Sequence, residues 1–338
     1  MKTTLRIWMT VFLFFLFTPI QASPDDEPLA EKLIETFKKP YLSLGVLLQT
    51  SLDFQSERIA AGNNGFRIPM ARIVVTGELD KKLGYLLNTN FLSSVAVLDA
   101  SLYWKLNSNV RLNAGLYRTF FSKEFSIGIP ALNFTTRSQI ASQLIPGRQI
   151  GMHLDVHNDI FKVSAGVYNG NGYGGNRNDN NDLMVMARAA VMPEIAGGSL
   201  ELGVNGATSN DNNVVYASRR FSGKRNILGA DIYFEQNALL LTGEYIYASL
   251  DSRSNTIDES NPQGFQATAG YKVKPDHQLL VRWDQIDLDE TVDANRLFLF
   301  GYNYWPTSIT KLRINYIINA DASSFDNHLI VLNTQFAF

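Results

Sequence analysis

His328 to Phe338 read HLIVLNTQFAF, and this last stretch of the chain decides the expected fold. Side chains of a β-strand alternate between two faces, so positions two apart lie on the same side. One face then holds Ile330, Leu332, Thr334, Phe336 and Phe338, and the other holds Val331, Asn333, Gln335 and Ala337. The first face suits lipid and the second suits water. An ordinary amphipathic strand would look the same, so the rest of the chain has to decide.

The same alternation recurs from Tyr41 onward, and in strands such as 97–106 and 311–319 it confines charge to one face. Lys311 and Arg313, for example, alternate with Leu312 and Ile314. A Lys or Arg on a lipid-facing position would cost about 2–4 kcal/mol at the bilayer midplane, whereas a wet lumen accepts it. The pattern predicts sixteen strands, at residues 41–54, 66–79, 83–92, 97–106, 110–118, 148–157, 160–168, 183–192, 200–208, 227–235, 238–249, 264–273, 278–287, 296–304, 311–319 and 328–338.

Connections between these strands alternate in length, as the two ends of a bacterial membrane barrel require. The short set is 80–82, 107–109, 158–159, 193–199, 236–237, 274–276 and 305–308. The long set is 55–65, 121–147, 169–182, 209–225, 252–263, 288–295 and 321–327, and only 93–96 is short where a long loop is expected. We therefore predict an all-β fold, a transmembrane antiparallel up-and-down β-barrel of 16 strands over residues 40–338.

The first residues have the features of an export signal. Lys2 and Arg6 precede an apolar run from Ile7 to Phe17, and Ala22 supplies a small residue for cleavage. These features predict a signal peptide at 1–22 and export to the outer membrane of a Gram-negative cell. An uncleaved anchor is the alternative, but the run is shorter than the roughly 20 residues that span a bilayer. Residues 23–39 have helical spacing and predict a short periplasmic helix, either a solvated leader or a partner-binding segment.

Composition narrows the function classes. Without residues 1–22 the chain keeps 28 basic and 32 acidic residues, so its formal net charge is −4 and no basic footprint for nucleic acid exists. There is no cysteine, which excludes disulfides and thiolate-bound metals. No later window of 18 uninterrupted apolar residues predicts a membrane helix. The sequence calls for no cofactor.

Leu116 to Met152 is the most informative internal stretch. Gly115 immediately precedes it, and the stretch contains Arg118 and Phe121-Ser122, then Arg137-Ser138, then Gly147-Arg148-x-Ile150-Gly151. With Phe66-Arg67-Ile68 and Arg72 earlier in the chain, these residues resemble the porin O/P family, whose members include phosphate-selective porins. The resemblance runs from about residue 41 to 338. Pro69 and Met70 stand where family members commonly have two further arginines.

The resemblance implies a homotrimeric channel whose third extracellular loop, Phe121 to Gly147, folds inward as a constriction. Small hydrophilic solutes, with anions such as phosphate expected, would diffuse through it passively. Guanidinium groups match the geometry of oxyanions, and Arg or Lys side chains arranged around a pore select anions. The predicted constriction residues are Arg72, Arg118, Lys123, Arg137, Arg148 and Arg188. The aromatic pair Phe336 and Phe338 resembles the signal read by the outer-membrane assembly machinery.

Other readings stay open. The predicted lumen carries both signs of charge, so a general solute pore is as consistent as a phosphate-specific one. His153, Asp155 and His157 share a face, but ligands about 7 Å apart are wide for one metal ion, and the run 176–182 lacks EF-hand spacing for calcium. An enzyme built on a barrel is one alternative, but the sequence contains no nucleophile motif or zinc motif. An adhesin or a purely structural barrel is another alternative, and it would conduct no ions.

Overall fold

The computed structural model describes residues 26–55, 64–92, 94–173, 177–253, 260–289, 293–320 and 328–338. The predicted signal peptide and most of the predicted loops 55–65 and 321–327 lie outside these residues. None of the described helices is long and apolar enough to span a membrane.

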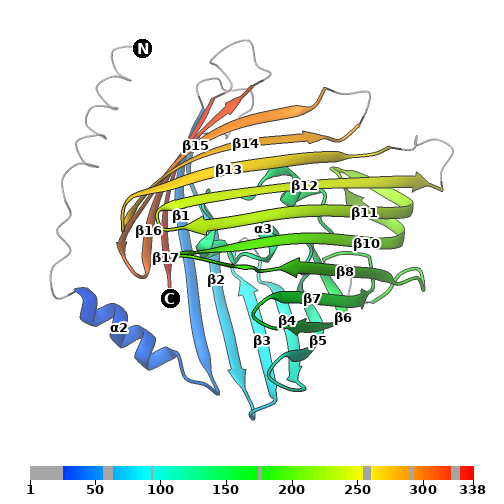
Figure 1. The fold of residues 1–338 in the computed structure, drawn as a ribbon, viewed down its shortest axis with the longest axis horizontal. Coiled ribbons are helices and arrows are strands. Elements are labelled where there is room, and N and C mark those ends of the chain that lie inside the picture. Colours follow the sequence, from blue (N-terminus) through cyan, green and yellow to red (C-terminus); the bar gives the residue numbers. More distant parts are fainter. Residues whose placement is uncertain are drawn as a thin grey trace.

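One antiparallel sheet closes on itself (Figure 1). Its strands are β1 (Ser43–Gln55), β2 (Gly65–Glu78), β3 (Leu83–Asn90), β4 (Ala96–Lys105), β5 (Val110–Arg118), β6 (Arg148–His157), β7 (Phe161–Tyr168), β8 (Met184–Val191), β9 (Glu194–Ile195), β10 (Gly198–Tyr216), β11 (Arg219–Gln236), β12 (Leu239–Ser252), β13 (Gln263–Lys274), β14 (His277–Asp287), β15 (Asn295–Thr307), β16 (Thr310–Asn319) and β17 (Leu329–Ala337). The two-residue β9 continues β8 along the edge of β10. The barrel therefore has the sixteen strands that the alternation predicts.

The last strand closes the barrel. β17 pairs with β1 over nine residue pairs, from Leu47 opposite Ala337 to Gln55 opposite Leu329. A closed ladder leaves no strand edge unpaired, which is what hydrocarbon surroundings demand of a backbone. Asn333 and Gln335 are buried on the inner side, as predicted, and the strand's other face carries Leu332 and Phe336.

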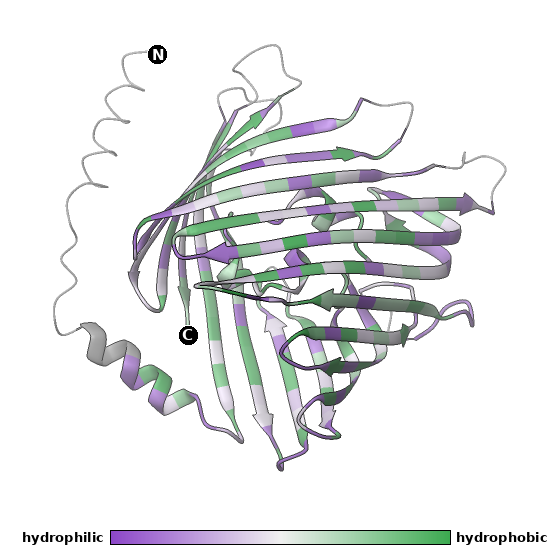
Figure 2. Cartoon of the chain, viewed as in Figure 1, coloured by the Kyte–Doolittle hydropathy of each residue, from purple (hydrophilic) through white to green (hydrophobic). Residues whose placement is uncertain are grey.

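The two faces of the wall differ as the sequence indicates. Figure 2 shows hydrophobic and hydrophilic residues alternating along the strands. Exposed apolar side chains such as Leu102 and Trp104 point outward, while Asp99 on the same strand is buried on the inner side. This arrangement places apolar surface toward lipid and polar surface toward the lumen.

One predicted loop is wrong. Residues 209–225, expected to be a long loop, continue β10 to Tyr216 and resume β11 at Arg219. The two strands meet at a tight turn in which Ala217 and Ser218 have φ values of 48° and 62°, the left-handed conformation of a two-residue hairpin turn. Outward positions in this part, such as Asn210 and Lys224, are polar, so the hydrophobic alternation stops although the ladder continues.

Before the barrel, α2 (Asp26–Phe37) forms the predicted short helix. Its last residue, Phe37, lies beside the carboxy-terminal Phe338, with ring centroids 5.9 Å apart. The backbone of Phe338 exchanges two hydrogen bonds of 3.2 Å with Val46 of β1. The end of the chain is therefore fastened to the strand at which the barrel starts.

Candidate functional site

The long segment between β5 and β6, residues 119–147, lies inside the barrel and is called loop 3 below. It contains α3 (Lys123–Ser126), a 3-10 turn η1 (Ile129–Ala131) and α4 (Gln139–Gln143). Figure 1 shows α3 within the ring of strands. Hydrogen bonds fasten the loop to inward side chains of the wall: Arg313 donates to the carbonyls of Leu132 and Phe134, at 3.3 and 3.2 Å, and Gln335 donates to that of Pro130 at 3.1 Å.

Apolar side chains of loop 3 fill the lumen on one side. Phe121, Phe134, Ile140 and Leu144 are almost fully buried, and most of the surrounding cluster comes from β8 and β10 to β12. Burying a side chain of this size contributes about 1.5–3 kcal/mol. The plugged half of the barrel is therefore a packed core rather than an aqueous space.

Glycines of the wall make room for these side chains. A Cβ on Gly264 would lie 2.6 Å from Ile140 Cγ2, and one on Gly301 would lie 2.9 Å from Phe134 Cε1. Real Cβ contacts are longer, so any side chain at these two positions would push the loop away from the wall. The close approach of loop 3 to the wall thus depends on the absence of a side chain at Gly264 of β13 and Gly301 of β15.

Four of the six predicted constriction residues come together on the open side of the loop. Arg72 of β2, Arg118 at the end of β5 and Arg148 at the start of β6 line one cavity of about 490 Å³ together with Gly128 to Pro130 of loop 3. Arg137 joins them through a shared acceptor, since Arg137 and Arg118 both donate to the carbonyl of Ile127, at 2.6 and 2.9 Å. These four residues are called the arginine cluster.

Asp99 of β4 is the carboxylate of this site. It accepts from Arg148 Nε at 2.9 Å and Nη2 at 3.2 Å, from the backbone N–H of Arg118 at 3.1 Å, and from Asn88 at 2.7 Å. Arg148 and Asp99 therefore form a bidentate ion pair, the geometry that fixes a guanidinium most firmly. One negative charge faces four positive ones, so the cluster keeps a positive excess.

Arg137 has carbonyl partners rather than a carboxylate. Its guanidinium donates to the carbonyls of Glu124 and Ile127 and lies 5.1 Å from the ring of Phe125. Burial, with a further contribution from Arg118, lowers the pKa of Arg137 to about 10. The side chain thus remains protonated at neutral pH, and the Glu124 carboxylate offsets part of its charge.

Arg72 has unused hydrogen-bonding capacity. Its Nε is buried and has no hydrogen-bond partner within the described part of the chain. A buried donor without a partner costs about 1–3 kcal/mol. Arg72 therefore adds a positive charge to the cluster, while its Nε has no fixed partner among the described residues.

The other two predicted residues lie elsewhere. Arg188 of β8 is 5% exposed and bonds to Asp231 and Glu201, the latter at 2.9 Å. Lys123 of loop 3 also pairs with Glu201. Both cations are matched by wall carboxylates, so this group is close to neutral and separate from the arginine cluster.

Two further cavities continue from the arginine cluster along the wall of β2 to β7. The first, of about 420 Å³, shares Arg118 with the cluster and adds Arg111 and Lys162. The second, of about 570 Å³, shares Arg111 and Lys162 and reaches the turn at Asn107, Ser108 and Asn158. Successive cavities with common walls form a path from the cluster to the barrel end at which these turns lie.

His153 and Asp155 belong to this path as hydrogen-bonded wall residues. His153 bonds to the hydroxyl of Tyr117 at 2.9 Å and lies 3.2 Å from Asp155 Oδ2, which also accepts from Arg111 at 3.1 Å. In the described residues no group of three or more His, Cys, Asp or Glu side chains gathers as a metal site would. Residue 176, the first of the run 176–182 considered for calcium, lies outside the described part of the chain.

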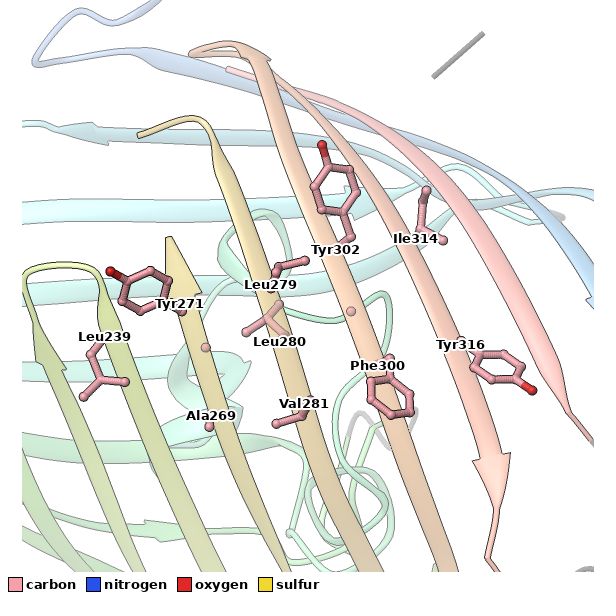
Figure 3. A pocket seen from close by; sticks show the side chains of 12 residues that line it. Leu239, Ala269, Tyr271, Leu279, Leu280, Val281, Phe300, Tyr302, Ile314 and Tyr316 are labelled. Atoms are coloured by element: carbon pink, nitrogen blue, oxygen red, sulfur yellow. The ribbon is translucent and has the colours of Figure 1, made fainter. Parts of the chain in front are cut away.

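A separate hollow of about 520 Å³ lies on the outer face (Figure 3). Leu279, Val281, Phe300 and Tyr302 line it with apolar or aromatic surface, and all of them alternate with inward residues of β14 and β15. Its chemistry suits hydrocarbon and it is not part of the path through the lumen.

Sequence reasoning missed the residues that hold loop 3. Arg313, Arg282 and Asp284 occupy lumen-facing positions of the alternation, which does not reveal a contact with a loop, and no motif marks Glu124. Asp284 accepts from the backbone N–H of Gln139 at 2.9 Å, and Arg282 donates to Glu124 at 3.0 Å. The inward glycines Gly264 and Gly301 were the signal available in the sequence.

Comparison with known proteins agrees with this geometry. The family described as phosphate-selective porin O and P matches residues 48–222, which is just over half of the chain. The chain belongs to the phosphate-selective porin O and P family. As a porin of this family it is a β-barrel channel of the outer membrane. No curated protein matches its sequence.

Solved porins share the fold of this porin O and P member at low identity. An anion-selective porin from Comamonas acidovorans aligns with a TM-score of 0.63 and 12% identity, over 88% of this chain and 99% of its own. A loop L8 deletion mutant of OmpT from Vibrio cholerae has a TM-score of 0.60 and 14% identity, over 88% and 99%. The channel DcaP of Acinetobacter baumannii has a TM-score of 0.59 and 12% identity, over 89% and 99%.

Proposed function

We propose that this porin passes small hydrophilic anions in preference to cations, by passive diffusion along the wall of β2 to β7. The observation that carries the proposal is the arginine cluster, in which Arg72, Arg118, Arg137 and Arg148 face one carboxylate where loop 3 narrows the lumen. A positive excess at a narrow aqueous neck lowers the barrier for anions and raises it for cations.

Phosphate is one expected permeant. The family description names phosphate, and the planar guanidinium fork matches a tetrahedral oxyanion through paired hydrogen bonds. Met70, however, faces the lumen opposite Gln49 at a position where the family resemblance leads one to expect an arginine. The basic track is therefore shorter here, which favours a preference for anions as a class over strict selection of phosphate.

A homotrimer is the expected assembly. One of the similar structures is a trimer form of OmpT from Vibrio cholerae, with a TM-score of 0.61 at 12% identity. The outward apolar wall offers surface for such an assembly, and cross-linking in native membranes would show a three-subunit species if the expectation holds.

The test is ion selectivity in planar bilayers. In a salt gradient the wild-type channel should give a reversal potential of the sign that anion preference requires. Replacing Arg118, Arg137 and Arg148 together with Ala should lower the anion-to-cation permeability ratio by about tenfold, since one unit charge at about 4 Å in water is worth about 1 kcal/mol. Blocking of the chloride current by added phosphate would identify phosphate as a bound permeant.

A matched control separates local charge from net charge. Replacing Arg177, Arg220 and Lys224 with Ala removes three positive charges from exposed positions outside the cluster. This control should keep most of the anion preference. A wild-type channel that prefers cations, or a cluster variant no different from the control, would contradict the proposed constriction, and an absence of conductance steps would contradict the pore itself.

A further inference from the structure

Glu124 is an acidic residue in the middle of the loop that shapes a basic constriction. Its side chain is 8% exposed and points to the wall, not to the cavity of the arginine cluster. One carboxylate oxygen accepts from Arg282 Nη2 of β14 at 3.0 Å and from the backbone N–H of Ser138 at 3.1 Å. The other accepts from the hydroxyl of Ser138. All of its described partners therefore lie on the packed side of loop 3.

Arg282 gives this carboxylate a fixed point on the wall. Its Nε donates to Thr268 at 2.9 Å, and its guanidinium lies 4.5 Å from the ring of Phe134. The ion pair is buried on both sides, with side-chain exposures of 5% and 9%. A buried, hydrogen-bonded pair holds its geometry, because breaking it leaves an uncompensated charge.

Glu124 is connected to Arg137 twice. The residue after Arg137 is Ser138, whose N–H and hydroxyl both bind the Glu124 carboxylate. The guanidinium of Arg137 in turn donates to the backbone carbonyl of Glu124. One side chain thus fixes both the backbone from which Arg137 extends and one of the carbonyls that receive its head group.

We infer that Glu124, held by Arg282, is a positioning residue for the selectivity of the channel. It acts through the placement of Arg137 beside Arg118 in the arginine cluster and not through its own charge. This inference rests on the anion preference proposed above. It adds Glu124 and Arg282, which lie outside the arginine cluster and hold one of its members in place. A consequence is that the loss of this negative charge weakens anion preference, which is the opposite of what a field effect produces.

The test compares variants that separate charge from geometry. Glu124→Ala removes the carboxylate and its hydrogen bonds, and should lower the anion-to-cation ratio by about two- to fivefold despite removing a negative charge, as expected if an interaction worth up to about 1 kcal/mol is lost. Glu124→Gln keeps acceptor oxygen and shape, and should restore the ratio to the wild-type value or above. Ser138→Ala changes no charge and should shift the ratio in the same direction as Glu124→Ala, by less.

Glu78→Ala is the control, because Glu78 is a lumen carboxylate that pairs with Lys105 and touches no described residue of loop 3. It should raise the anion preference. Open-channel current noise gives a readout that does not depend on ion preference, and it should increase in Glu124→Ala but not in Glu78→Ala. Heat-modifiable migration on gels verifies that each variant has folded.

The outcomes are distinct. If Glu124→Ala raises the ratio as Glu78→Ala does and leaves the noise unchanged, Glu124 acts only as a charge and the inference fails. If the wild-type channel lacks anion preference, the proposed function fails, and the noise of Glu124→Ala and Ser138→Ala still decides whether Glu124 positions the loop.

Discussion

Asp99 is a single residue that connects members of the arginine cluster to one another. Its carboxylate holds Arg148 through two hydrogen bonds and receives the backbone N–H of Arg118. It also cancels part of the positive field that the cluster produces. The same residue therefore holds Arg148 and Arg118 in position and lowers the net positive charge of the arginine cluster.

Replacing this carboxylate with its amide separates the two effects. Asp99→Asn should raise the anion-to-cation ratio, since one negative charge is removed while an acceptor oxygen remains. The loss of the charge-assisted pair should cost stability by about 1–3 kcal/mol. Reversal potentials and the midpoint of thermal unfolding in detergent measure the two quantities. A lower anion-to-cation ratio in Asp99→Asn would show that Asp99 affects selectivity more by holding Arg148 in place than by offsetting positive charge.

Loop 3 is the element whose position depends most on buried polar contacts. Arg313 is 1% exposed, and its donors reach the carbonyls of Leu132 and Phe134 as well as the side chains of Asn333 and Gln335. Lys311 adds a second donor to Leu132, at 2.7 Å. No carboxylate pairs with either cation among the described residues, so loop carbonyls serve as their partners.

Arg313→Met should loosen this element without opening the barrel. The substitution keeps much of the volume but leaves the carbonyl of Phe134 without its donor and that of Leu132 with Lys311 alone, so we expect a loss of about 2–5 kcal/mol in the free energy of unfolding. Faster proteolysis within residues 119–147 of the folded porin would report the loosening. Arg67→Met, at an exposed pair with Asp53, serves as the control and should change neither quantity appreciably.

The elements differ in how much their sequence reveals. Strands of the membrane zone were predicted because lipid and water impose opposite chemistry on alternate residues, as in Leu312 and Arg313. The continuation of β10 to Tyr216 was not, because beyond the lipid both faces of a strand can be polar. The contacts of Glu124 and Arg282, 158 positions apart in the chain, depend on how loop 3 packs, and no local pattern encodes that packing.

The same distinction applies to the arginines. Family motifs predicted Arg118, Arg137 and Arg148, and the fold brings them together with Arg72. The sequence did not distinguish these arginines from Arg188, because it does not show whether a carboxylate on a neighbouring strand pairs with a lumen-facing arginine. Asp231 and Glu201 lie on neighbouring strands, and only the register of β8, β10 and β11 shows that they neutralise Arg188.

The whole molecule depends on the closure between its first and last strands. Phe338 contributes two backbone hydrogen bonds with Val46 and a ring that lies 5.5 Å from Phe336 and 5.9 Å from Phe37. Phe338 therefore makes both aromatic contacts and backbone hydrogen bonds where the barrel closes. We expect assembly of the barrel to be more sensitive to Phe338 than conduction is.

Deleting Phe338 should reduce the amount of folded porin in the outer membrane, while the channels that do form should conduct as the wild type does. Phe338→Ala keeps the backbone pair and removes the ring, so it tests whether the aromatic side chain itself is read during assembly. Heat-modifiable migration of membrane fractions measures both variants, with Phe66→Ala, at an exposed outward position, as the control. Normal assembly of both variants would contradict the proposed role of the terminal aromatic residues.

Loop 3 divides the barrel into two halves, and this division bears on how such a channel can change over evolutionary time. Strands β14 and β16 must keep the buried cations that anchor loop 3, and β13 and β15 must keep the glycines against which it packs, or the loop loses its contacts with the wall. Strands β2 to β7 carry the passage and contact the plug less, so they can exchange one lumen side chain for another with little loss of stability. Met70 in place of an arginine fits such a substitution. A lineage could in this way alter which nutrient it admits while keeping the scaffold that makes admission selective.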